Sequence, residues 1–276
     1  MKKIITPLLL MIFLSSFLTS CKKDKDNPPA LPPEESMTID FRNFESGNKS
    51  AVAYSSKGVE NSNWEFAALV AGYFRTMVAG TLAVPVYSFK LASGGAPVLI
   101  EDKTWQWSYS VSLTGMTYKA RLTGQIRSTD VQWKMYITGE GTVGFPEFLW
   151  FEGTSKSDGT GGQWMLNHSP LFNEPALQID WTLSGNTTDV IKYTWIRSLG
   201  DDRDPDPFKT SNIEYGKLTG TFDSYYSIYF FNGLAFSEMD VEWHSSTHNG
   251  RVRSISNFGD TNWHCWNGNL VNIICP

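Results

Sequence analysis

The sequence predicts an all-β fold: a mainly antiparallel meander that closes into a barrel or two packed sheets, with one long buried helix near its N-terminus. Apolar and polar residues alternate with a period of two through most of the chain after residue 104. Such alternation is typical of strands with one buried and one solvated face, as in antiparallel sheets. A single apolar run of helical length precedes these strands.

We expect about eleven strands after residue 104, since the alternation returns in 105–113, 116–126, 131–137, 177–183, 191–195 and 239–243. Connections such as Thr114-Gly115 are too short for crossover helices. An aliphatic–hydroxyl–glycine ending recurs at Gly115, Gly124, Gly139, Gly185 and Gly220. We expect these glycines to supply the positive φ of a turn or bulge. An open sheet of this size tends to curl, which favours a closed barrel or two packed sheets.

The helix is expected near residues 63–84. Ser62 and Glu65 have the spacing of a capping box, which satisfies free backbone donors at a helix start. The apolar run 67–86 follows, and Pro85 disfavours helix at the residue before it.

A membrane-spanning segment is the alternative interpretation of this run. Arg75 at mid-depth would cost about 2.5–3.5 kcal/mol in a bilayer, so a core helix packed against the sheet is favoured. We expect Leu69 to be buried by the sheet and Arg75 to be paired or to reach solvent along its stem.

The composition excludes several classes of protein. The 276 residues include 23 basic and 28 acidic side chains, and the formal net charge is -5. No basic block is present, which argues against binding of nucleic acid through its phosphates. Charged residues are 18% and hydrophobic residues 41% of the chain, proportions unlike those of a disordered polyelectrolyte or a multispan membrane protein.

The first residues have the pattern of a secretory signal. Lys2 and Lys3 precede the apolar stretch 4–18, which is too short for an ordinary spanning helix, and Leu18-Thr19-Ser20-Cys21 closes it. This tetrapeptide resembles the lipobox of bacterial lipoproteins. The resemblance implies a signal peptide at 1–20, a lipidated Cys21 that carries palmitate-type acyl chains, and attachment to a membrane through those chains.

Residues 21–36 are expected to form a disordered, charged and proline-rich tether ahead of a single domain at 37–276. The lysines and acids after Cys21 resemble the export signal of Bacteroidetes-type surface lipoproteins. That resemblance implies an outer-membrane location with display on the cell surface rather than in the periplasm. A solvated spacer without specific meaning is the alternative.

Cys265 and Cys275 would be the only thiols left after lipidation of Cys21. An oxidising compartment favours a disulfide between them. Asn267-Gly268 predicts instead a two-residue hairpin turn, which would separate the cysteines by about 17 Å along the strand. The tight hairpin and the disulfide exclude each other, and we expect the disulfide to prevail, with a compact loop in place of a last strand.

No motif identifies an active site. Asp202, Asp204 and Asp206 alternate as calcium ligands do in a loop, but an acidic turn explains them as well, and no cofactor is expected otherwise. Candidates for a carboxylate pair in glycoside cleavage are Glu147, Glu152, Glu174 and Asp180. Their separations are not encoded in the sequence.

Aromatic residues are the remaining signal: the chain has 11 Trp, 11 Tyr and 17 Phe. Most are expected in the core. In the adjacent pairs Trp150 with Phe151 and Tyr225 with Tyr226, one ring of each pair must face away from the core, where it can stack on a ligand.

Three functions remain open. The first is a lipid-anchored binding or accessory protein that recognises carbohydrate or an apolar ligand through aromatic side chains. The second is a structural envelope lipoprotein with a packed barrel and no small ligand. The third is a hydrolase with an unrecognised carboxylate pair. The first two are not enzymes, and none of the three involves nucleic acid.

Overall fold

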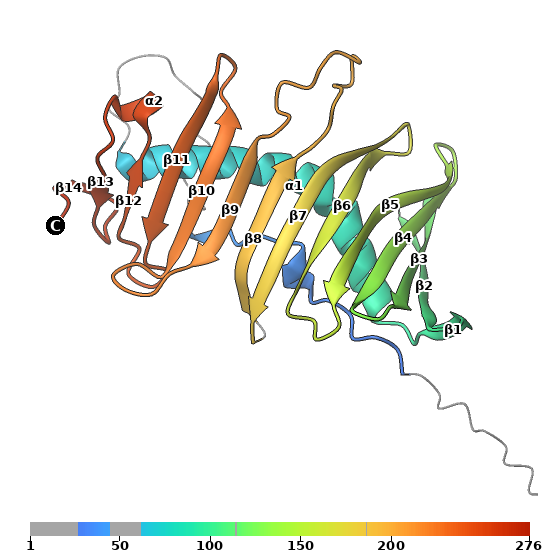
Figure 1. Ribbon diagram of the computed structural model, residues 1–276. Helices are drawn as coiled ribbons and strands as arrows, with labels where there is room; N and C mark the ends of the chain where they lie inside the picture. The colour runs from blue at the N-terminus through green and yellow to red at the C-terminus, as the bar shows by residue number, and fades with distance from the viewer. Residues whose placement is uncertain (1–26, 45–61, 114, 186) are drawn as a thin grey trace, which may run out of the picture.

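The computed structural model describes residues 27–44, 62–113, 115–185 and 187–276. Within them, fourteen strands form one antiparallel sheet whose spatial order follows the sequence (Figure 1). The strands are β1 (Val98–Glu101), β2 (Thr104–Leu113), β3 (Met116–Ile126), β4 (Asp130–Glu140), β5 (Phe145–Lys156), β6 (Gly161–Ser169), β7 (Phe172–Ser184), β8 (Thr187–Trp195), β9 (Asn212–Lys217), β10 (Ser224–Phe231), β11 (Phe236–Trp243), β12 (Gly250–Arg253), β13 (His264–Trp266) and β14 (Asn272–Ile273). The all-β class with one long helix is confirmed.

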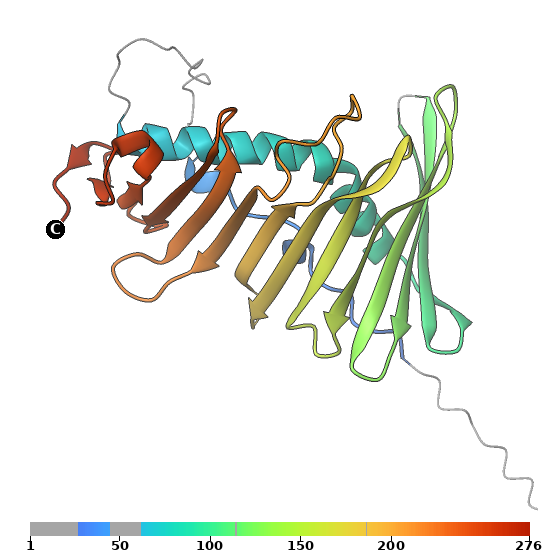
Figure 2. The ribbon, with the colours of Figure 1, turned by 45° about the horizontal axis from the view of Figure 1, so that its top comes forward.

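The sheet does not close, so a single open sheet replaces the expected barrel or pair of sheets. Its edges are β1 and β14. The long helix α1 (Asn63–Ser93) crosses one face, here called the inner face, from β12 and β13 at its start to β2 and β3 at its end (Figure 2). The short helices η1 (Glu34–Ser36) and η2 (Arg42–Phe44) lie on the same face, and α2 (Ile255–Phe258) lies beside β11. Because helices cover the apolar face, no second sheet is needed to bury it.

The predicted start of α1 is confirmed. The Ser62 hydroxyl accepts a hydrogen bond from the Glu65 backbone N–H at 3.1 Å, and the Ser62 N–H donates to Glu65 Oε2 at 2.9 Å. The predicted end is wrong, because the helix continues through Pro85 to Ser93. Phe89 is buried beyond the proline, so packing on the sheet outweighs the lost backbone hydrogen bond. The helix changes direction in its C-terminal half (Figure 1), as expected near an internal proline.

Only one side of α1 packs on the sheet. Its buried side includes Val70, Phe74, Val78 and Leu82. The expectation that Leu69 is buried is wrong: 37% of its surface is exposed, since it lies on the opposite side of the helix. Arg75 is exposed, as expected.

Large and small residues alternate across the inner face of the sheet. Trp105, Gly124, Trp133, Gly153 and Trp164 lie opposite one another on successive strands from β2 to β6. Each glycine gives room for the indole of the next strand, which is how a sheet accommodates several tryptophans in one row.

The recurrent glycines therefore have two roles. Gly115, Gly185 and Gly220 have positive φ, as expected for turns. Gly124 and Gly139 lie inside strands instead, beneath the rings of Trp133 and Phe145 respectively.

The buried aromatic side chains hold the N-terminal segment with their polar atoms. Trp164 Nε1 donates to Ser36 Oγ at 3.2 Å, and the Tyr193 hydroxyl donates to the Met37 carbonyl at 2.7 Å. Farther along, the Tyr226 hydroxyl donates to the Asp40 carbonyl at 2.7 Å. Pro32 is also buried, so the folded domain begins before the expected boundary at residue 37.

Candidate functional site

A groove of about 580 Å³ lies over β4 to β9. Alternation along the strands places most of its lining side chains on the outer face, opposite α1. Hydroxyl groups come from Thr129, Thr154 and Thr182. Charged groups come from Asp130, Lys156, Asp180, Lys192 and Glu214. Most of the lining side chains are therefore polar or charged, and the groove lies on the solvated side of the sheet.

Gly161 leaves space in the middle of this groove. It begins β6, between Lys156 at the end of β5 and Thr182 on β7. A Cβ at this position would lie 3.1 Å from the Trp181 carbonyl oxygen and 3.6 Å from both Lys156 Cε and Thr182 Cγ2. A side chain here would therefore crowd the groove between these neighbours.

Asp180, Lys192 and Glu214 face one another on the adjacent strands β7, β8 and β9. Asp180 accepts hydrogen bonds of 2.7 Å from the side-chain amides of both Gln163 and Gln178. Lys192 Nζ lies 3.9 Å from Glu214 Oε2. Each carboxylate oxygen has more than one lone pair, so both acids can still accept hydrogen bonds from a ligand.

The charges around the groove balance. At its β4 end, Arg127 forms an ion pair of 2.6 Å with Asp130. Besides this pair, the groove has two cations, Lys156 and Lys192, and two anions, Asp180 and Glu214, so its charges are equal in number. A balanced groove has no field that would select a highly charged ligand.

Tyr225 adjoins the far end of the groove. Its hydroxyl donates to Glu214 Oε1 at 2.7 Å. Its ring lies over Gly216 of β9, where a side chain would collide with the ring atoms. Burial, and then the hydrogen bond to Glu214, raises the pKa of Tyr225 above its usual value, so the phenol remains a neutral donor.

The four aromatic candidates are not brought together. Phe151 and Tyr226 are wholly buried in the core. Trp150 is an extra residue at a bulge opposite Met135 and Tyr136, and its ring packs edge-on against Phe148. Only Tyr225 lies next to the groove.

The acidic loop does not gather its carboxylates. Asp206 is buried and accepts from Arg197 Nε at 2.6 Å and from Trp195 Nε1 at 3.1 Å. Asp202 and Asp204 are exposed, and Asp202 accepts the Asp204 N–H. Among the described residues, no group of three or more His, Cys, Asp or Glu is arranged to hold a metal ion.

The candidates for a glycosidase pair have separate partners. Glu147 binds Arg121 at 2.6 Å, Glu152 lies 4.0 Å from Lys134 Nζ, and Glu174 lies 3.4 Å from Arg203 Nη1. Asp180 is held by the two glutamines described above. Each acid is therefore engaged in its own local contact.

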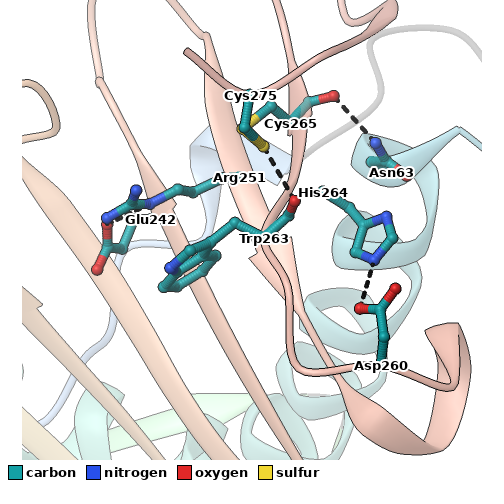
Figure 3. Close-up of a disulfide and its surroundings, with 8 residues drawn as sticks. All are labelled: Asn63, Glu242, Arg251, Asp260, Trp263, His264, Cys265 and Cys275. Atoms are coloured by element: carbon teal, nitrogen blue, oxygen red, sulfur yellow. Dashed lines mark hydrogen bonds and ion pairs between the residues drawn. A yellow bond between two sulfur atoms is a disulfide. The ribbon is translucent and has the colours of Figure 1, made fainter.

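A disulfide joins Cys265 and Cys275, whose Cα atoms are 5.1 Å apart (Figure 3). The two-residue hairpin at Asn267-Gly268 is replaced by a turn over 267–271, in which Asn267 N–H donates to the Val271 carbonyl. A two-residue strand, β14, persists where a loop alone was expected. The Asn63 side chain at the start of α1 donates to the Cys265 carbonyl at 2.9 Å, and its backbone N–H donates to Asn272 Oδ1 at 2.8 Å.

Cys21, the expected lipidation site, lies outside the described residues. Sequence reasoning also missed Lys192 and Glu214 as site residues. The alternation predicts that both lie on the solvated face, but the sequence does not give the strand register that places them side by side. No family model, curated protein or solved structure matches the chain.

Proposed function

We propose that this chain is a lipid-anchored, extracytoplasmic binding protein, not an enzyme, that recognises carbohydrate at the outer groove. The observation that carries the proposal is the combination of hydroxyl groups, balanced charges and an adjoining aromatic ring in one groove. Carboxylates, lysines and hydroxyls match the donors and acceptors of a sugar, and an aromatic ring gives its apolar face a surface to stack on.

An apolar ligand has less support. The inner face, where apolar side chains gather, is filled by α1 and by residues 27–44, which pack on the same core. In the outer groove, an apolar ligand would leave the hydroxyl and charged groups of the lining without hydrogen-bond partners. The aromatic residues of this chain therefore serve mainly as core, and Tyr225 remains as the ring that can meet a sugar.

The location is part of the proposal. The lipobox-like sequence at 18–21 supports acylation of Cys21, and the charged residues after it support display on the surface of a bacterial outer membrane. The disulfide supports an oxidising compartment, since such bonds persist outside the cytosol. A Cys21→Ala variant is expected to lose both the acyl mass and membrane fractionation. Unchanged fractionation would contradict the anchor.

Carbohydrate binding is tested by calorimetry on the soluble domain, residues 22–276, with cellohexaose, laminarihexaose, mannohexaose and maltohexaose. We expect at least one to bind, and Tyr225→Ala to weaken that binding at least tenfold. Tyr225→Phe keeps the ring and is expected to retain most of the affinity. An acidic hexagalacturonate is expected to bind more weakly than its neutral counterparts, because the groove has balanced charge.

Tyr229 provides a matched control. It lies on the same strand as Tyr225, where its ring stacks on Phe236 at 4.8 Å. Tyr229→Ala is expected to leave binding unchanged. Equal losses in the two variants would show a general effect of removing a ring from β10, which would count against a specific role of Tyr225.

A structural envelope lipoprotein is the second candidate. It is favoured by the filled inner face, since a packed interior is what a protein without a small ligand requires. If none of the four neutral hexasaccharides binds the folded domain, the carbohydrate proposal fails and this role is preferred.

A further inference from the structure

The groove is longer across the strands than along them. Its lining includes residues from six successive strands, β4 to β9, and from the turn before β4. No strand contributes more than three consecutive positions. Neighbouring strands are about 4.8 Å apart and successive residues about 3.4 Å apart, so the groove is roughly 24 Å across the strands and less than 10 Å along them.

Polar side chains continue the axis of the groove beyond its β9 end. One row of directly opposed residues crosses from β4 to β12 without an apolar member: Gln132, Thr154, Gln163, Asp180, Lys192, Glu214, Ser227, Asp240 and Arg253. Most of these residues are half-buried, so their polar atoms lie close to the sheet. A ligand that follows this axis meets a hydrogen-bonding group at every strand.

Resting on the proposed function, we infer that the ligand is an extended chain of neutral sugar units that lies across the strands, along this row. The strand spacing is close to the length of one unit in an extended glycan. Successive units can therefore contact successive strands. The balance of Lys156 and Lys192 against Asp180 and Glu214 favours an uncharged chain over an acidic one.

Chain length gives the first test, with the hexasaccharide that binds best and its own monosaccharide and disaccharide. A chain that crosses six strands is expected to gain at least tenfold in affinity from disaccharide to hexasaccharide. Equal affinities for the two would overturn the inference and leave the proposed function intact. If no saccharide of any length binds, the proposed function itself fails.

Substitutions at the two ends give the second test. Lys156 ends β5 and Tyr225 is on β10, roughly 24 Å away across the sheet. Lys156→Ala and Tyr225→Ala are each expected to weaken hexasaccharide binding at least fivefold, because one chain contacts both. A ligand aligned with the strands contacts at most one of them, so an effect of only one variant would overturn the crossing orientation.

A bulky substitution in the groove tests whether the glycan lies there and not elsewhere on the outer face. Thr182 is exposed beside Gly161, and Thr182→Trp is expected to reduce hexasaccharide binding at least twentyfold by filling the groove. Thr138 is on β4, opposite Lys119 of β3, and it is not among the residues that line the groove. Thr138→Trp is expected to bind as the unmodified domain does. Equal binding by Thr182→Trp and the unmodified domain would overturn the placement of the chain.

Discussion

The indole of Trp133 lies against Gly124 on the neighbouring strand, where a Cβ atom would come within 2.5 Å of Trp133 Cζ3. Trp133 is wholly buried, so its ring has no free space into which to move. The glycine is thus required by its neighbour, not by its own backbone angles. The row from Trp105 to Trp164 contains a second contact of the same kind, between Gly153 and Trp164.

Gly124→Ala is expected to destabilise the domain by about 1–3 kcal/mol, because overpacking forces the ring and backbone apart. Chemical denaturation measures the change. Gly80→Ala is the control: nothing lies within 4 Å of its Cβ position on α1, and alanine favours helix by up to about 1 kcal/mol. Destabilisation by Gly80→Ala equal to that by Gly124→Ala would contradict the role of the tryptophan contact.

The two sides of α1 are expected to differ sharply in their tolerance of charge. Leu82→Asp places a carboxylate at a position only 4% exposed and should cost at least about 3 kcal/mol of folding free energy. Leu69→Asp, on the exposed side, should cost less than about 1 kcal/mol. Thermal melts of the two variants measure this contrast, and similar melting temperatures would show that α1 does not pack as described.

The disulfide is expected to stabilise the domain by about 2–4 kcal/mol. Cys275→Ser should lower the melting temperature, and dithiothreitol should bring the unmodified domain to the same value. The variant itself should not respond to the reductant. An unmodified domain that melts at one temperature with and without dithiothreitol would refute a stabilising role for the Cys265–Cys275 bond.

The buried ion pair between Arg197 and Asp206 predicts a loss of stability in acid. Burial alone would raise the pKa of Asp206, but hydrogen bonds from Arg197, Trp195 and the Phe208 N–H hold it below its ordinary value of 3.8. A carboxyl with a lowered folded-state pKa stabilises fully above about pH 4, and the contribution is lost as pH falls through that lower pKa.

Asp206→Asn should therefore reduce stability at pH 7 and make the fall below pH 4 less steep. Denaturation curves from pH 2 to pH 7 measure both effects. The exposed Asp204→Asn reports the general effect of removing one charge from this loop. An unaltered acid profile in Asp206→Asn would assign the acid sensitivity to other carboxylates.

Strands and their faces could be predicted from the sequence because both depend on local alternation. The inward positions Trp107, Trp133 and Trp181 are buried, as their period-two pattern indicates. Register across strands is not local, so the groove formed by Asp180, Lys192 and Glu214 could not be predicted. The packing of α1 on the sheet was predicted, but that the sheet stays open beneath it was not foreseeable, for the same reason.

At two positions, tertiary contacts outweigh a local rule. Pro85 predicts a helix end, but Phe89 gains burial when the helix continues. Asn267-Gly268 predicts a tight turn, but the bond between Cys265 and Cys275 requires the longer one. The bulge at Trp150 is a third local departure, because one extra residue interrupts strict alternation.

The hydrogen bonds from Asn63 to Asn272 and Cys265 connect residues more than 200 positions apart. Every strand pair in the sheet joins neighbours in sequence, so hairpins can form one after another as the chain is synthesised. The start of α1, by contrast, is synthesised early, but the strands that it packs against, β12 and β13, are synthesised late. The end of α1 can already pack on β2 and β3, whereas the apolar side of its start stays uncovered until β12 and β13 emerge, and exposed apolar surface of this kind promotes aggregation.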